Sequence, residues 1–265
     1  KGVTKIGRNA FRKCEKLKSV KIPNSVKVIE SGAFASCDNL RSITLPKNIE
    51  VIEEYAFQYC DGITHITIPG SLTYLGNLFR DCNNLTSVTI EHGVQTIGER
   101  AFYQCESLRN ISIPNSVTEI GFLAFAYCRN LKSINIPESV KSIGESAFNS
   151  CVKLKSITLP EGITKIEYYT FDECDALTTV TLPASLQEIE EGAFDGCHKL
   201  TSITLPDGLT RIGNGAFSWC TGLQSITIPN SVTKIESYAF SWCKHLKYAT
   251  VPSHTILGRE VFPEH

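Results

Sequence analysis

Eleven cysteines recur at an almost fixed interval, and this spacing constrains the fold more than any other feature of the chain. Successive cysteines are 23 residues apart, except for one step of 22 between Cys60 and Cys82. A strict period of about 20 to 50 residues is typical of solenoids, in which each unit buries its apolar edge against the next. We therefore expect a stack of about eleven units, which we call coils. The cysteines are Cys14, Cys37, Cys60, Cys82, Cys105, Cys128, Cys151, Cys174, Cys197, Cys220 and Cys243.

The first half of each coil predicts a short strand. Counting each cysteine as position 0, apolar residues recur at positions 3, 6, 8, 12, 15, 19 and 20, as in the coil from Cys128 to Ser150. Within it, residues 131–137 alternate apolar and polar side chains, which is the pattern of a half-buried strand. Position 9 is almost always proline, and it ends the strand because proline has no N–H for a ladder.

The second half of the coil predicts a shorter strand and a turn. Val140 and Ile143 point inward on an extended segment, and Gly144 begins a predicted short helical turn that carries Ala147 and Phe148 to the next cysteine. Stacking these coils predicts a main parallel β-sheet, a second row of short strands and a row of short helical turns.

The runs at 131–144 (Leu-x-Ser-Ile-Asn-Ile-Pro-x-Ser-Val-x-x-Ile-Gly) and 147–151 (Ala-Phe-x-x-Cys) resemble the BspA-like (Treponema pallidum type) leucine-rich repeat. The resemblance covers essentially the whole chain. It implies a leucine-rich repeat solenoid of the α/β right-handed superhelix type. It also implies a cell-surface or secreted protein of host-associated microbes, of the kind that adheres to host matrix proteins or to other microbes.

The repeats run without a linker, so we expect residues 1–265 to form one elongated domain. A partial repeat at 1–13 precedes the first cysteine. We expect an irregular C-terminal cap at 244–265, where the repeat register slips by one residue. The coil between Cys60 and Cys82 lacks a residue before Phe79, which makes its local geometry hard to predict.

The cysteines favour a structural role over chemistry. Zinc ligands come in close pairs, whereas no two cysteines here are closer than 22 residues. A column of small buried thiols at one corner of each coil fits the spacing best. The six histidines occupy unrelated repeat positions, and carboxylate pairs such as Glu53 and Glu54 suit the start of a helical turn. We therefore expect no catalytic residues, no metal and no cofactor.

The net charge of −1 and the pI near 6.7 give no reason to expect binding to nucleic acid. No apolar run approaches the roughly 18 residues of a membrane span, so we expect no direct membrane insertion. These numbers leave protein and glycan partners open.

The outward side of the main sheet is the first candidate binding surface. Positions 4, 5 and 7 project from it, and position 4 is often Lys or Arg while most carboxylates fall on the turn side. A basic Ser/Thr-rich face fits an acidic protein segment or a sulfated glycan. The Ser and Thr columns also have a purely structural explanation, since they favour strands. The candidate residues are Lys18, Lys21, Arg41, His65, Arg109, Lys132 and Lys155.

Trp219 and Trp242 form the second candidate. Both occupy position 22, just before a cysteine, on adjacent coils. Aromatic side chains are enriched at binding hot spots, but this position also fits packing under the corner of the coil.

Two hypotheses follow for function. The first is a non-enzymatic, adhesin-like interaction module whose sheet face binds an extracellular matrix or surface protein, or a sulfated glycan. The second is a structural spacer that has no ligand of its own.

Overall fold

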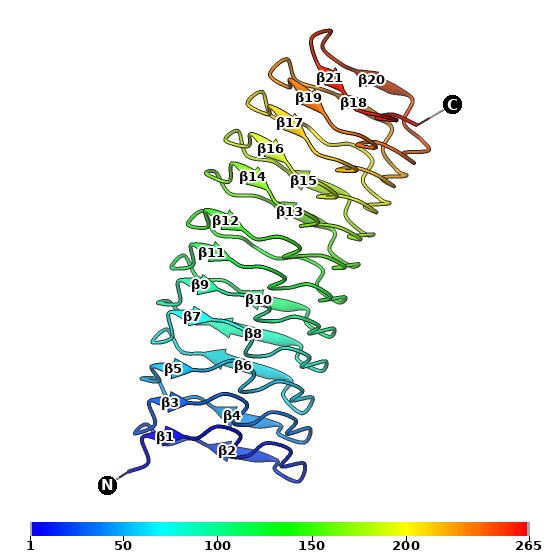
Figure 1. Cartoon of the computed structure of the whole chain (residues 1–265). Helices are drawn as coiled ribbons and strands as arrows, with labels where there is room; N and C mark the ends of the chain where they lie inside the picture. Colours follow the sequence, from blue (N-terminus) through cyan, green and yellow to red (C-terminus); the bar gives the residue numbers. More distant parts are fainter. Residues whose placement is uncertain (1, 264–265) are drawn as a thin grey trace.

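The structure is a computed structural model that describes residues 2–263. It is an elongated stack of coils that rises without a break from the N-terminal to the C-terminal end (Figure 1). The solenoid expected from the cysteine period is confirmed, and so are its two rows of parallel strands.

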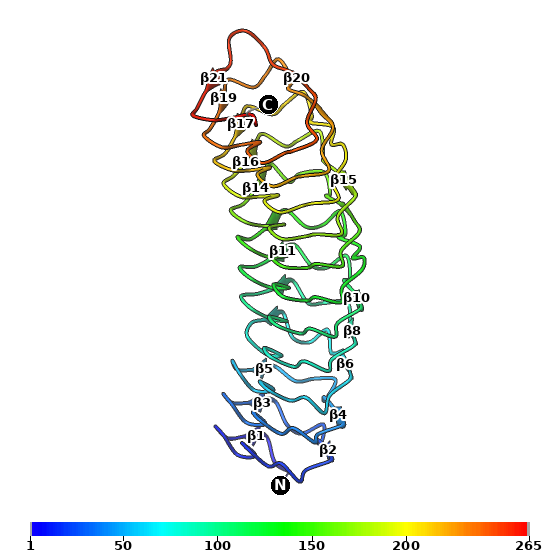
Figure 2. The same ribbon diagram turned by 90° about the vertical axis from the view of Figure 1, so that its right-hand side faces the viewer.

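The main strands lie at positions 5 to 8 of the coils and pair in parallel at equal repeat positions, such as Ser19 with Ser42. They follow one side of the stack (Figure 2). They form the sheets β2-β4, β10-β8-β6, β13-β15 and β18-β20. The main strands are β2 (Ser19–Lys21), β4 (Ser42–Thr44), β6 (His65–Ile68), β8 (Ser87–Ile90), β10 (Asn110–Ser112), β13 (Ser156–Thr158), β15 (Thr179–Thr181), β18 (Ser225–Thr227) and β20 (Tyr248–Thr250).

The second strands are two residues long and follow another side of the stack (Figure 2). They form the sheets β1-β3-β5, β12-β11-β9-β7 and β14-β16-β17-β19-β21. In the last pair Lys234 lies opposite Ile256, so the register slips by one residue as the sequence predicts. The second strands are β1 (Lys5–Ile6), β3 (Val28–Ile29), β5 (Val51–Ile52), β7 (Tyr74–Leu75), β9 (Thr96–Ile97), β11 (Glu119–Ile120), β12 (Ser142–Ile143), β14 (Lys165–Ile166), β16 (Glu188–Ile189), β17 (Arg211–Ile212), β19 (Lys234–Ile235) and β21 (Ile256–Leu257).

The predicted short helical turns are wrong. No helix occurs within residues 2–263, and the segments carrying Ala-Phe are chains of β-turns. In the partial repeat before Cys14 the N–H groups of Asn9, Phe11 and Lys13 donate to carbonyls of the next coil at 2.7–3.0 Å, while the N–H groups of the residues between them donate to carbonyls three residues back. Asn9 and Lys13, at positions 18 and 22, have φ of 55° and 60°, a left-handed conformation that interrupts a right-handed helix.

The core is a set of parallel side-chain columns that run the length of the stack. Neighbouring position-20 phenylalanines stack with ring centroids 5.1–5.8 Å apart, from Phe11 to Phe262. Beside them runs the column of cysteine thiols, all free and all buried except the half-buried Cys14. Each buried thiol donates to a phenylalanine carbonyl of the preceding coil, as Cys37 Sγ does to Phe11 O at 3.0 Å. The predicted column of buried thiols is confirmed.

The second row of strands is interrupted twice, between β12 and β14 and at the shortened coil between Cys60 and Cys82. β5 and β7 lie on adjacent coils but do not pair. The missing residue corresponds to position 18. Asn77 O accepts from Tyr55 N, as position 17 does in other coils, and the next residue, Leu78, already accepts from Phe57 N, as position 19 does. Asn77 is buried, and its Oδ1 has no hydrogen-bond partner among the described residues.

Candidate functional site

The surface that we call the sheet face consists of the side chains at positions 4, 5 and 7 of every coil. It carries no aspartate or glutamate, although the chain has 27 of them. Its cations are exposed, and within residues 2–263 none of them is in an ion pair. The sheet face is therefore uniformly neutral or positive. Its cations are Lys18, Lys21, Arg41, Arg109, Lys132, Lys155 and Lys247.

Two pairs of these cations are direct neighbours. Lys155 N donates to Lys132 O at 3.0 Å, and Arg41 N donates to Lys18 O at 2.9 Å. The two side chains of each pair therefore project from the same side of adjacent coils. Arg109 occupies the same position one coil before Lys132. Like charges directly opposite each other on a sheet are destabilising. The fold gains nothing from these pairs.

The surroundings of the cations differ along the stack. Arg41 borders a groove of about 520 Å³ that also contains the carboxylates of Asp38 and Asp61, so the charge there is mixed. Lys21 borders a smaller hollow of about 280 Å³ on the sheet face itself. Arg109, Lys132 and Lys155 form the longest run of consecutive position-4 cations.

His65 lies exposed at the start of β6, where serine is usual. Its Nδ1 is 2.8 Å from Thr64 Oγ1 on the same coil. This contact holds the ring against its neighbour.

Trp219 and Trp242 are 40% and 54% exposed, so they do not pack under the corner of the coil. Their rings stack on each other with centroids 4.9 Å apart and planes 9° apart, and Lys244 Nζ lies 5.8 Å from the Trp219 centroid. Trp219 lies two coils after the coil of Lys155 and at repeat position 22 rather than position 4. The structure therefore does not join the tryptophans and the lysine row into one site.

The basic character of the N-terminal segment, residues 2–29, was not identified from the sequence. Between residues 2 and 29, Glu15 is the one carboxylate in the sequence, against eight lysines and arginines. Within the described residues, Lys5 and Lys27 pair with Glu30 and Glu50. The cations of this segment are Lys5, Arg8, Arg12, Lys13, Lys16, Lys18, Lys21 and Lys27.

The side of the second strands distributes charge in the opposite way. Glu190 is 3% exposed and accepts ion pairs from Lys165 at 2.7 Å and from Arg211 at 2.5 Å. Arg211 also pairs with Glu188 and Glu236. Cations here are neutralised within the protein, whereas those of the sheet face are left to solvent.

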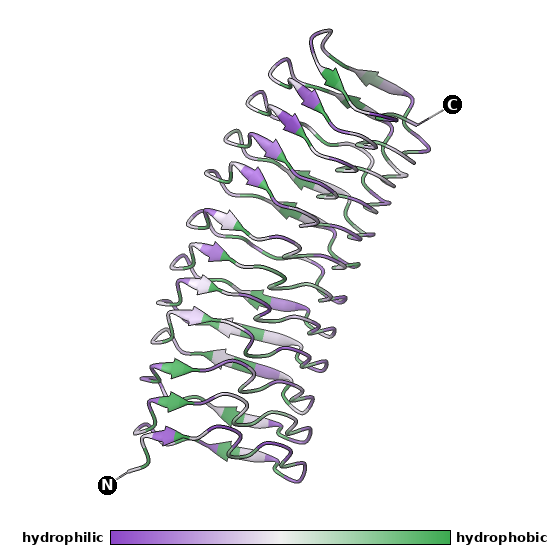
Figure 3. Cartoon of the chain, viewed as in Figure 1, coloured by the Kyte–Doolittle hydropathy of each residue, from purple (hydrophilic) through white to green (hydrophobic). Residues whose placement is uncertain are grey.

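Figure 3 shows how the second strands vary along the stack. β14, β16, β17 and β19 change from hydrophilic to hydrophobic between their two residues, whereas β3 and β5 are hydrophobic throughout. Within residues 2–263 there is no helix long and apolar enough to cross a membrane. The same residues contain no group of three His, Cys, Asp or Glu side chains that could hold a metal ion.

A stack of 23-residue coils with a parallel sheet along one side and β-turns along another defines a leucine-rich repeat protein. The family described as BspA type leucine rich repeat region matches residues 1–78, 76–175 and 141–265. The chain belongs to this family. A comparison with curated proteins finds no match.

Several solved structures are similar to the chain. A leucine-rich repeat protein of Bacteroides ovatus is 29% identical with a TM-score of 0.74, over 97% of this chain and 78% of that one. A leucine rich cell surface protein of Faecalibacterium prausnitzii is 29% identical with a TM-score of 0.52, over 94% and 83% of the two chains. The T. pallidum leucine rich repeat protein is 30% identical with a TM-score of 0.57, over 60% and 78%.

Proposed function

We propose that this protein is a non-enzymatic interaction module of a cell-surface or secreted protein. Its sheet face binds an extracellular matrix or surface protein, or a sulfated glycan. The observation that carries this proposal is a face without carboxylates on which Arg109, Lys132 and Lys155 follow one another, with no ion pair to any of them among the described residues.

The spacing of Arg109, Lys132 and Lys155 along the stack suits an extended anion. Neighbouring coils are spaced by roughly 4.7–4.9 Å, the usual separation of paired strands. An acidic peptide or a sulfated chain lying along the stack therefore meets one cation per coil at Arg109, Lys132 and Lys155. Such contacts are exposed, so their contribution falls as salt rises.

The location at the cell surface is supported by resemblance. The F. prausnitzii relative is a cell surface protein, and the match to it covers nearly all of this chain. An exposed module needs no reactive group. The buried thiols and the internally paired carboxylates are consistent with a scaffold that presents a face.

The test is binding to immobilised matrix proteins and sulfated glycans, using the protein and a variant with Arg109, Lys132 and Lys155 all changed to Glu. A second variant with the exposed Lys16, Lys47 and Lys199 changed to Glu carries the same net charge but alters other surfaces. We expect the first variant to lose at least tenfold in affinity and the second to lose little. Equal losses would show that the sheet face is not the site.

A spacer without a ligand is the second candidate. It is favoured by Thr86 and Thr178, whose Oγ1 atoms donate to Thr64 O at 2.8 Å and Lys155 O at 3.1 Å on the neighbouring coil. These side chains are satisfied within the stack. Absence of saturable binding across the whole panel would support this alternative.

A further inference from the structure

Glutamates at position 16 follow a simple rule in this structure. Each lies just after a second strand, and in four of the five the carboxylate pairs with a cation at position 14. Glu30 pairs with Lys5 of the preceding coil, Glu190 with Lys165, and Glu236 with Arg211, the last two at 2.7 Å and 3.2 Å. Glu167 pairs with Lys165 of its own coil at 3.3 Å.

Glu53 is the exception among the described residues. The position that supplies a cation to Glu30, Glu190 and Glu236 holds Val28 here, and its own coil holds Val51. Glu53 Oε2 accepts a hydrogen bond from Ser31 N at 2.9 Å, but within residues 2–263 no lysine, arginine or histidine forms an ion pair with it. The half-buried carboxylate therefore has no cation within ion-pair distance, although the charge of Lys5, which pairs with Glu30, also acts on it.

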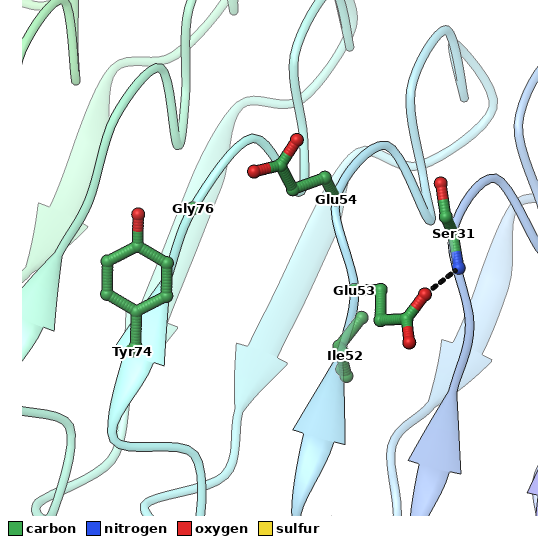
Figure 4. Close-up of a pocket in the computed structure, with 6 residues that line it drawn as sticks. All are labelled: Ser31, Ile52, Glu53, Glu54, Tyr74 and Gly76. Atoms are coloured by element: carbon green, nitrogen blue, oxygen red, sulfur yellow. Dashed lines mark hydrogen bonds between the residues drawn. The ribbon is translucent and has the colours of Figure 1, made fainter.

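A pocket lies beside this unpaired carboxylate. It opens where β5 and β7 fail to pair, has a volume of about 400 Å³, and no cation lines it among the described residues. Figure 4 shows Tyr74 on one side of the opening, with Ile52, Glu53 and Glu54 on the other. Over the part of the chain that the structure describes, the Glu54 carboxylate is in no ion pair either.

Glycines hold the Tyr74 ring in place. A Cβ atom at Gly76 or Gly98 would lie only 2.4–2.5 Å from the nearest ring atoms of Tyr74, so the ring rests against both backbones. Tyr74 is nevertheless 54% exposed. The ring therefore has a fixed place beside the pocket and remains accessible.

We propose that this pocket binds the cationic end of a lysine or arginine side chain from a protein partner. Glu53 and Glu54 supply the opposite charge, the Tyr74 ring supplies a cation–π contact, and Ile52 packs against the aliphatic stem. The ligand would replace the cation that the repeat places at position 14 elsewhere. This site is on the second strands and does not depend on the sheet face.

Other occupants fit less well. Phosphate or carboxylate groups would be repelled by Glu53 and Glu54. A purely apolar side chain would bury the Glu53 carboxylate without a partner, which is costly. A side chain with an ammonium or guanidinium group satisfies both the charge and the apolar wall.

The test is titration of the whole protein with Nα-acetyl-lysine N-methylamide and with the arginine analogue, followed by NMR at the amides of Ser31 and Gly76. Ser31 N–H donates to Glu53, so its resonance reports on that carboxylate. The norleucine analogue has a similar stem without the charge and is the control ligand. We expect weak, saturable shifts with lysine or arginine and none with norleucine.

Three variants make the test specific. Glu53→Gln keeps an acceptor for Ser31 and should weaken binding about fivefold. Tyr74→Val, a residue that Val28 and Val51 show to be compatible with this position, should weaken it about threefold. Val28→Lys should abolish binding by supplying the internal cation that Lys5 supplies to Glu30.

Equal shifts with norleucine would overturn the proposal, as would unchanged affinity in Glu53→Gln. Absence of saturable shifts with both cationic ligands would also overturn it. Glu145→Gln, an exposed carboxylate at the repeat position of Glu54 but on a distant coil, is the matched control and should bind like the unchanged protein. The triple sheet-face variant should also bind these ligands normally, which separates this proposal from the proposed function.

Discussion

Lys132 and Lys155 stand side by side on adjacent coils, fixed by the hydrogen bond from Lys155 N to Lys132 O at 3.0 Å. Further along the chain, Lys165 lies at another repeat position and pairs with the buried Glu190. The protein thus neutralises cations on one side and leaves them adjacent and exposed on another. Exposed like charges are tolerated where their net cost is small and where a partner supplies the missing anion.

Phe125→Ala should be strongly destabilising. The Phe125 ring is fully buried between Phe102 and Phe148, with centroids at 5.5 Å and 5.4 Å. Removing it leaves a cavity in the continuous column and should cost about 3–5 kcal/mol in the free energy of unfolding. Urea denaturation measures this. The exposed Lys132→Ala is the control and should change stability by less than about 0.5 kcal/mol.

Glu190→Gln should destabilise the protein in a pH-dependent way. Burial acts to raise the pKa of Glu190, but hydrogen bonds and charges from Lys165 and Arg211 outweigh it, so the pKa is lowered. The charged form therefore stabilises the fold above the ordinary carboxyl range, and this stability is lost as pH falls through the lowered pKa. We expect a cost of about 1–3 kcal/mol at pH 7. Urea denaturation should show a smaller difference at pH 3, and a constant difference would contradict this account.

Asp172→Asn should have the opposite effect. Burial, together with repulsion from the carboxylates of Asp195 and Glu173, raises the pKa of Asp172 to about 7. A raised carboxyl pKa means that the folded state binds a proton more tightly than the unfolded chain, so stability falls as pH rises from about 4 to 7. Asparagine keeps the acceptor for Asn149 Nδ2, which lies 2.7 Å from Asp172 Oδ2.

The variant should therefore gain about 1–2 kcal/mol over the unchanged protein at pH 8 and little at pH 4, since partial exposure of Asp172 screens part of the effect. Thermal unfolding at the two pH values measures this gain. An equal effect of Asp172→Asn at both values would show that Asp172 is not protonated preferentially in the fold.

Thiol reagents should distinguish one cysteine from the other ten. Cys14 is half-buried, whereas burial raises the pKa of Cys37 to about 11 and those of Cys60 and Cys151 to about 12. Reaction needs an accessible thiolate. We expect one fast equivalent with an aromatic disulfide reagent in the folded protein, removed by Cys14→Ser. Several fast equivalents would contradict the buried column.

The repeat positions of cysteine, proline and phenylalanine were enough to predict the coils and both rows of strands. They were not enough for the turn segment, because tyrosine and tryptophan, as well as glycine, adopt positive φ there. Tyr55, Tyr59 and Trp219 have φ of 62°, 57° and 55°, which their residue types do not suggest. Gly192 and Gly215 occupy the same repeat position as Tyr55, and glycine there was the sequence signal for a left-handed backbone.

The candidate sites were predictable to different degrees. Columns of one repeat position become faces of the stack, so the row of Arg109, Lys132 and Lys155 could be found from spacing alone. The pocket beside Glu53 could not, because it depends on a relation between position 16 of one coil and position 14 of the coil before it. The coil that contains Gly76 is one residue short, which indicated an irregularity there but not which side chains line the pocket.

Recognition through the sheet face is tested most directly by the salt dependence of affinity for whichever matrix protein or sulfated glycan the panel identifies. We predict that log affinity falls steadily as log salt rises, and that the slope becomes shallower when Arg109, Lys132 and Lys155 are changed to Glu. An affinity that does not change with salt, or the same slope in both proteins, would contradict recognition through the sheet face.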